Sequence, residues 1–251
     1  MPFVERPDGV RIAYETHGSG PPLILLHGGG QSRKTWIDAG YVESLAARRE
    51  VILMDARAHG ESDGPLERSA YSLEAVTGDV LAVADACGAQ RFDLVGYSYG
   101  GNVGRFVAAH SGRVDRFVLI GIGFGAGAEG PFRARIDEML APWAPVLRDP
   151  PEPEALSPEL QTLWAQPSTQ GRLAWFGALL EWPGLEPQDL ACPTLWLVGS
   201  KNEVGALDNF HAHRPDFAKH GIQGVILDGL DHAAEMTATE MVLPLVDGFL
   251  T

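Results

Sequence analysis

The stretch Gly96-Tyr97-Ser98-Tyr99-Gly100 lies between an apolar run at residues 92–95 and a segment of helical composition at residues 101–109. A strand, the pattern G-x-S-x-G and a helix, in that order, are typical of a nucleophile elbow, a sharp turn that lifts a serine hydroxyl clear of a sheet. Glycine at both outer positions avoids the clash of a Cβ atom in so tight a turn. The stretch therefore predicts a strand-turn-helix unit with Ser98 as nucleophile. The alternative is a plain glycine-rich turn with a surface serine.

Further apolar runs indicate a buried sheet, and they lie at residues 23–26, 51–54, 117–120, 194–198 and 224–227. Runs that are apolar throughout are typical of parallel strands buried on both faces. Most are separated by segments with helical spacing, such as the helix expected from its cap Ser72 to Gly88. The N-terminal part predicts two short antiparallel strands, one of them the alternating residues 10–16. The order predicts an α/β fold, a mostly parallel sheet flanked by helices. A closing helix at residues 236–250 should be kinked or split by Pro244.

Residues 124–187 interrupt this rhythm, because they contain many prolines and no strand-like run. Segments rich in helix formers within them predict a small helical cap or lid, inserted into a core made of residues 1–123 and 188–251. Four of the six tryptophans lie in this insertion. We expect most of its aromatic residues to pack the cap onto the core and one or two to face a cavity.

Composition excludes several classes of protein. The 251 residues carry a formal charge of −14, which argues against nucleic acid and anionic membrane surfaces as partners and weakly disfavours highly anionic substrates. No apolar run is long enough to span a bilayer, and the N-terminus does not resemble a signal peptide. The two cysteines give neither a disulfide framework nor a metal-ligand spacing. We expect a cytoplasmic protein.

Several motifs together resemble the α/β-hydrolase fold family. They are His27-Gly28-Gly29-Gly30, residues 55–63 of the pattern D-x-R-x-x-G-x-S, the elbow at Ser98, residues 198–203, and residues 228–232. The resemblance covers nearly the whole chain and includes the family's order of nucleophile, acid and histidine. It implies an α/β-hydrolase sheet with a small helical cap and a serine hydrolase or esterase activity that needs no metal or cofactor.

Chemical roles can also be assigned to individual residues independently of that resemblance. Ser98 would attack an acyl carbon, and a serine hydroxyl needs an adjacent base to do so. Among eight histidines, His232 is the expected base because it follows the last strand, where open α/β sheets gather their site residues. The family pattern implies an oxyanion hole made of the backbone N–H groups of Gly29 and Tyr99.

The third member of the site is the difficulty. In the resembling family an aspartate commonly stands where this chain has Asn202, and an amide carries no charge to stabilise an imidazolium. We take Glu203 as the expected acid, on the ground that its longer side chain could reach His232. The alternatives are Asn202 as a neutral orienter, or an acid from another strand end, although residues 121–123 offer none. Asp228 and Asp231 are expected to point elsewhere or to cap the following helix.

Two further expectations concern the surroundings of the site. Trp36 follows the glycine loop and is a candidate for lining the substrate pocket, although packing is an equal alternative. Asp55 and Arg57 are expected to brace their loop as a charge-assisted pair.

The sequence predicts a serine hydrolase that cleaves a small ester, lactone or related acyl substrate through an acyl-enzyme. The alternatives are a C–C hydrolase, lyase, cofactor-free oxygenase or perhydrolase on the same scaffold, or an impaired ligand-binding protein because of Asn202. The expected partner is a small-molecule acyl substrate, with no nucleic acid and no membrane. Oligomeric state is not readable from the sequence.

Overall fold

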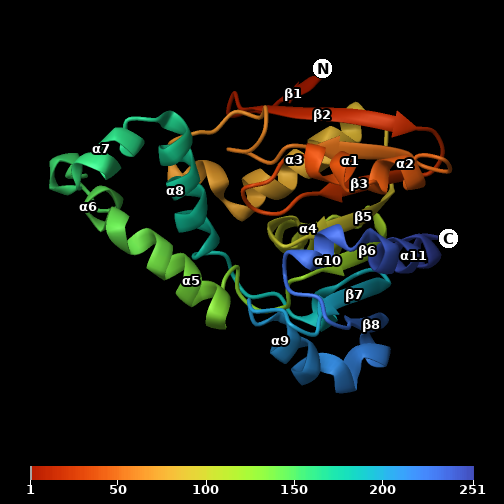
Figure 1. The fold of residues 1–251 in the computed structure, drawn as a ribbon. Coiled ribbons are helices and arrows are strands. Elements are labelled where there is room, and N and C mark those ends of the chain that lie inside the picture. Colours follow the sequence, from red (N-terminus) through yellow and green to blue (C-terminus); the bar gives the residue numbers. More distant parts are fainter. Residues whose placement is uncertain (1) are drawn as a thin grey trace.

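An eight-stranded sheet organises the computed structural model, which describes residues 2–251 (Figure 1). Its strands are β1 (Phe3–Glu5), β2 (Arg11–Gly18), β3 (Pro22–Leu26), β4 (Glu50–Met54), β5 (Phe92–Tyr97), β6 (Val114–Ile120), β7 (Thr194–Gly199) and β8 (Ile222–Leu227). They are ordered β1-β2-β4-β3-β5-β6-β7-β8. β2 pairs antiparallel with β1 and β4, and all other neighbours are parallel. The expected mostly parallel α/β sheet is therefore confirmed.

Helices cover both faces of this sheet. They are α1 (Lys34–Asp38), α2 (Tyr41–Leu45), α3 (Leu73–Ala86), α4 (Tyr99–His110), α5 (Gly130–Leu140), α6 (Ala144–Leu147), α7 (Pro158–Trp164), α8 (Pro167–Leu179), α9 (Ala206–His213), α10 (Ala234–Thr237) and α11 (Thr239–Leu250). Short 3₁₀ turns lie at Arg68–Tyr71, Ala141–Trp143, Pro153–Ala155, Pro187–Asp189 and Arg214–His220. Ser72 accepts a hydrogen bond from the Ala75 N–H and so caps α3, as the sequence indicated.

Successive side chains of the central strands enter opposite cores. In β3, Ile24 and Leu26 pack into the core under α3 and α4, whereas Leu23 and Leu25 pack into the core under α1, α2 and α11. Side chains alternate between the faces of a strand, so a strand buried on both faces must be apolar at every position. This explains why the continuous apolar runs in the sequence mark the sheet.

Helices α5 to α8 all lie between β6 and β7 in the chain and are set apart from the sheet, at the left of Figure 1. We call these four helices the cap.

The two cysteines, Cys87 and Cys192, are free thiols. Within residues 2–251, no helix has the length and apolar composition that crossing a bilayer requires.

The closing helix differs from the expectation. The break falls at Ala238, between α10 and α11, and Pro244 lies inside α11. Proline at this position removes the hydrogen bond to the carbonyl of Glu240, in the first turn of the helix. Because Glu240 is exposed, water can satisfy that carbonyl, so the helix continues through Pro244.

Candidate active site

Ser98 occupies the sharp turn between β5 and α4. Its backbone angles, φ 51° and ψ −115°, are unusual for a residue with a side chain. A Cβ atom at Gly96 would lie 2.5 Å from the carbonyl oxygen of Gly100, and one at Gly100 would lie 2.1 Å from that of Leu26. The two glycines are therefore what allows the backbone to turn so sharply and present the Ser98 hydroxyl.

His232 lies directly opposite this hydroxyl. Its Nε2 atom is 2.9 Å from Oγ of Ser98, across 134 positions of sequence. Tyr97 fixes the position of His232 by two contacts. Its ring stacks on the imidazole at a centroid distance of 5.2 Å, and its hydroxyl donates to the carbonyl of His232 at 2.7 Å. The geometry thus brings together the serine and the histidine that the sequence singled out.

Glu235 completes the arrangement on the other side of the ring. Its Oε2 atom lies 3.0 Å from Nδ1 of His232, and its side chain is fully buried. The Gly199 N–H donates to Oε1 at 2.5 Å, and Asn202 Nδ2 donates to the same oxygen at 2.9 Å. Two donors besides the imidazole therefore stabilise a buried negative charge at Glu235. With Nδ1–H donating to Glu235, Nε2 is left to accept the proton of Ser98.

The structure places the expected acid Glu203 elsewhere. Its Oε2 atom accepts the backbone N–H of His232 at 3.1 Å, and half of its side chain is exposed. Burial raises the pKa of Glu203, but this hydrogen bond, one from its own backbone and the charge of His232 together outweigh burial, so the pKa is lowered. The expectation that Glu203 reaches the imidazole ring is therefore wrong, because its position beside the backbone of His232 directs its carboxylate to the main chain.

Asn202 is close to the ring but is directed at the acid. Its Nδ2 atom is 3.4 Å from Nδ1 of His232, farther than from either oxygen of Glu235. Its Oδ1 atom accepts the backbone N–H groups of Val204 and Ala206 at the start of α9. Asn202 therefore holds Glu235 rather than the histidine.

Sequence reasoning missed Glu235. The available signal is its spacing: a residue three positions after His232, on a helix that begins immediately afterwards, returns to the same side as the histidine. Of the other acids near His232, Asp231 accepts the N–H of Ala234, the first residue of that helix, and Asp228 accepts the hydroxyl of Ser200.

Two backbone N–H groups at the cavity that contains Ser98 are unengaged. Within residues 2–251, the N–H groups of Gly29 and Tyr99 donate no hydrogen bond, whereas their neighbours in the glycine loop are engaged. Gly28 N–H donates to Oε1 of Gln31 at 2.9 Å, and Gly30 N–H donates to Nε2 of His59 at 3.0 Å. The loop is thus tied on both sides of Gly29, which fixes the position of the Gly29 N–H.

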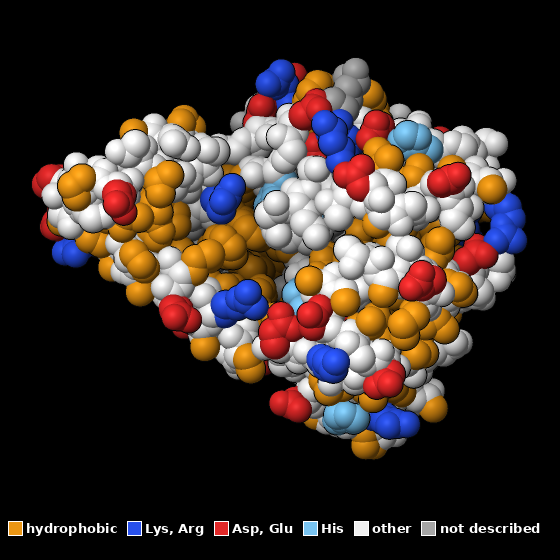
Figure 2. Space-filling view, viewed as in Figure 1, with side chains coloured by type: hydrophobic (Ala, Val, Ile, Leu, Met, Phe, Trp, Pro, Cys, Tyr) orange, Lys and Arg blue, Asp and Glu red, His pale blue; other side chains and the backbone are white. Residues whose placement is uncertain are grey.

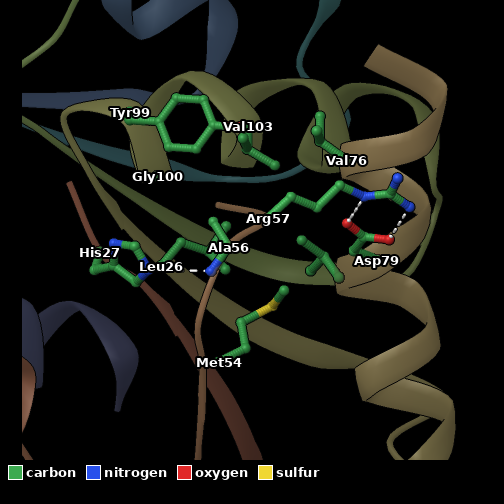
Figure 3. Close-up of a pocket in the computed structure, with 11 residues that line it drawn as sticks. Leu26, His27, Met54, Ala56, Arg57, Val76, Asp79, Tyr99, Gly100 and Val103 are labelled. Atoms are coloured by element: carbon green, nitrogen blue, oxygen red, sulfur yellow. Dashed lines mark hydrogen bonds and ion pairs between the residues drawn. The ribbon is translucent and has the colours of Figure 1, made fainter. Parts of the chain in front are cut away.

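Buried histidines support this loop. His27 accepts the Ala56 N–H at Nε2 (Figure 3), and its Nδ1 lies 2.8 Å from the carbonyl of Gly28. His59 makes the corresponding pair of contacts with the Gly30 N–H and the carbonyl of Arg57. Burial lowers the pKa of His27 to about 4 and also lowers the pKa of His59. Both rings are therefore neutral at pH 7 and can accept a backbone N–H.

The expected pair of Asp55 with Arg57 does not form. Arg57 instead donates two hydrogen bonds, of 2.6 and 2.8 Å, to Asp79 on α3 (Figure 3). Asp55 is bound by the guanidinium and the backbone N–H of Arg33. The loop that begins at Asp55 is therefore held by two separate pairs, Asp55 with Arg33 and Asp79 with Arg57.

A cavity of about 390 Å³ opens above Ser98, between the cap and the sheet. Figure 2 shows a hollow in this region with apolar side chains over its floor. Phe132 from α5 and Trp175 and Phe176 from α8 line it, so three cap aromatics face the cavity where one or two were expected. Trp36 does not line it: helix α1 turns this side chain into the core, where it is fully buried against Tyr41.

Comparison with known proteins finds a matching family model and several similar proteins. Residues 21–144 match the family model described as alpha/beta hydrolase fold. Over 123 residues the chain is 37% identical to a non-heme haloperoxidase of Rhodococcus erythropolis, covering 48% of this chain and 44% of that protein. Over 131 residues it is 33% identical to a 2-hydroxymuconate semialdehyde hydrolase of Pseudomonas sp. strain CF600, covering 51% and 45%. The chain thus spans less than half of the length of these curated relatives.

Solved structures resemble the whole chain. A hydrolase from Pseudomonas aeruginosa PA01 has a TM-score of 0.78 at 26% identity, and the match covers 99% of this chain and 97% of that one. An esterase from Exiguobacterium antarcticum has a TM-score of 0.75 at 21% identity, with 99% of each chain covered. At that identity the esterase likeness shows the fold alone.

Proposed function

The chain belongs to the α/β-hydrolase fold family, and on that premise we propose that it is a serine hydrolase of small carboxylic esters, lactones or related acyl compounds. One observation carries the proposal: a continuous hydrogen-bonded path runs from Oγ of Ser98 through His232 to the buried Glu235. This is the arrangement that activates a serine hydroxyl, with a base beside the nucleophile and a carboxylate beside the base.

In the proposed reaction, Oγ of Ser98 attacks the acyl carbon while its proton passes to Nε2 of His232. Glu235 stabilises the resulting imidazolium, and the N–H groups of Gly29 and Tyr99 stabilise the oxyanion. His232 then gives the proton to the departing alkoxide, which leaves as an alcohol. A water molecule repeats the sequence on the acyl-enzyme with His232 as base, which releases the carboxylic acid and restores Ser98.

The impaired ligand-binding alternative rested on Asn202. That objection loses its force because a carboxylate lies at Nδ1 of His232 although residue 202 is an amide. Glu235 is buried and held by two other donors, so its carboxylate is held in position before a substrate arrives.

A serine-directed fluorophosphonate and two esters, p-nitrophenyl acetate and butyrate, test the proposal. We expect the wild type to be labelled and to hydrolyse the esters, and Ser98→Ala to do neither. Ser44→Ala, which changes an exposed serine on α2, is the matched control and should behave as the wild type. Absence of labelling and turnover in the wild type, or labelling that persists in Ser98→Ala, would overturn the proposal.

A further inference from the structure

Arg172 lies at the wall of the cavity that contains Ser98, on the side of the glycine loop. It belongs to α8, one turn before Trp175, whose ring lies so close to the loop that a Cβ at Gly29 would be 2.6 Å from it. The positive charge of Arg172 also contributes to the low pKa of His59, which binds the adjacent Gly30, although burial is the larger cause. Arg172 therefore shares the cavity with the proposed oxyanion hole, one helical turn from the ring that lies against Gly29.

The charges that line this cavity do not balance. Besides His232, they are Arg135, Arg172 and Glu203. Arg135 lies 3.6 Å from the carboxylate of Glu203, so these two charges offset each other. Across residues 2–251, no carboxylate lies within 4.0 Å of the guanidinium of Arg172. The cavity therefore carries one positive charge without a counter-ion.

Other arginines of the cap are paired, which makes Arg172 an exception. Arg133, Arg135 and Arg148 each lie within 4.0 Å of an aspartate or glutamate. In a chain with a formal charge of −14, carboxylates are plentiful, yet none within residues 2–251 reaches Arg172, whose exposed side chain is solvated and open to an anionic group that enters the cavity. The overall negative charge, which disfavours anionic substrates at long range, is screened beyond about 8 Å at physiological salt. The local charge therefore decides what binds at contact distance.

We propose that Arg172 binds a carboxylate in the acyl part of the substrate, so that the preferred substrates are monoesters of dicarboxylic acids or similar anionic acyl compounds. The inference rests on the proposed serine hydrolase function. The leaving group must point toward His232, which protonates it, and Glu203 and Arg135 lie on that side. The acyl chain is then directed to the wall formed by α8, where Trp175 and Phe176 provide apolar contacts for its methylenes.

Two matched substrates test this assignment: mono-4-nitrophenyl adipate, with a terminal carboxylate, and 4-nitrophenyl hexanoate, which is neutral and has the same chain length. In the wild type we expect kcat/KM for the adipate ester to exceed that for the hexanoate by about tenfold or more. In Arg172→Gln the ratio should fall to near one, mainly through a higher KM for the adipate ester. Arg172→Lys should keep part of the preference, because it keeps the charge without the planar fork.

Arg133→Gln is the control, because Arg133 lies on the same cap, is paired with Asp137 and does not line the cavity. It should keep the wild-type ratio. Equal rates for the two esters in the wild type, or an unchanged ratio in Arg172→Gln, would refute the carboxylate assignment and leave ester hydrolysis intact. Calorimetric titration with adipate separates the two claims: weaker binding in Arg172→Gln than in the wild type supports the subsite even if Ser98 proves unreactive, and equal binding contradicts it.

Discussion

Asn202 donates its side-chain amide to Glu235, with Nδ2 lying 2.9 Å from Oε1 and 3.2 Å from Oε2. The α/β-hydrolase family commonly has its acid at the position of Asn202. Here the uncharged amide at this position instead holds Glu235, an acid from another part of the chain. Because Oδ1 of Asn202 is fixed by the N–H groups of Val204 and Ala206, Nδ2 is directed toward the carboxylate. The carboxylate beside His232 therefore comes from α10 and not from residue 202.

The first prediction concerns the charge of Glu235. In Glu235→Gln, the imidazolium loses its counter-ion, and an amide N–H directed at Nδ1 would favour the wrong tautomer of His232. We expect kcat/KM for p-nitrophenyl butyrate to fall by about 10²–10⁴-fold. Steady-state kinetics of the purified variant measure this loss.

Glu203→Gln is the matched control, because it removes a carboxylate that touches the backbone of His232 but not its ring. Its kcat/KM should stay within about threefold of the wild type, since an amide oxygen can still accept the N–H. The reverse ranking, with Glu203→Gln the weaker enzyme, would show that Glu203 is the acid.

A second prediction concerns Asn202→Asp, which would place two carboxylates about 3 Å apart. Two such groups cannot both ionise without strong repulsion, so the pair retains a proton. At low pH the protonated pair imitates the present amide-to-carboxylate hydrogen bond, and turnover should approach that of the wild type. As the pH rises and the proton leaves, repulsion displaces Glu235 and turnover falls, by about tenfold. A pH profile in which Asn202→Asp is faster than the wild type throughout would contradict this account.

The sheet and the elbow could be predicted because they depend on local features. A strand that is buried on both faces must be continuously apolar, and a turn as tight as that at Ser98 requires glycine at Gly96 and Gly100. His232 could be selected because it follows the last strand of a parallel sheet, where site residues gather.

The acid and the pocket wall could not be predicted, because both depend on the direction of a side chain. Four carboxylates lie within a few residues of Asn202 or His232, namely Glu203, Asp228, Asp231 and Glu235. Only the start of α10 directs Glu235, and not Asp231, toward the imidazole ring. Trp36 follows the glycine loop, but the orientation of α1 sends its ring into the core. The spacing of Glu235 from His232 becomes informative only once α10 is known to begin between them, and composition gives neither direction.

Gly121 gives a third prediction, because it provides the space that Glu235 occupies. A Cβ atom there would lie 2.3 Å from Oε2 of Glu235 and 3.0 Å from Nδ1 of His232. Gly121→Ala should therefore displace the carboxylate and lower kcat/KM by about 10²-fold, approaching the effect of losing its charge. Alanine also costs about 1–2 kcal/mol at the φ of +76° found there.

Gly112→Ala separates the two effects, because Gly112 has a φ of +64° and open space around its Cβ position. Thermal unfolding should show a loss of stability in both variants, larger in Gly121→Ala because its Cβ also overlaps Glu235, with turnover lost only in Gly121→Ala. Equal turnover in the two variants would mean that the contact with Glu235 does not control activity.

The fourth prediction concerns acid stability. Burial holds the pKa of His27 at about 4 in the folded protein, against 6.5 for an unperturbed histidine. Because the unfolded chain binds the proton more readily, the free energy of unfolding falls as the pH drops from about 6.5 to about 4, by about 3 kcal/mol for this group at most. Above pH 6.5 the contribution of neutral His27 is fully present.

His27→Gln should flatten this part of the curve in urea unfolding between pH 4 and 8, since glutamine can accept the Ala56 N–H without titrating. His211→Gln, at an exposed position on α9, should keep the wild-type slope, and an unchanged slope in His27→Gln would place the acid sensitivity in other groups.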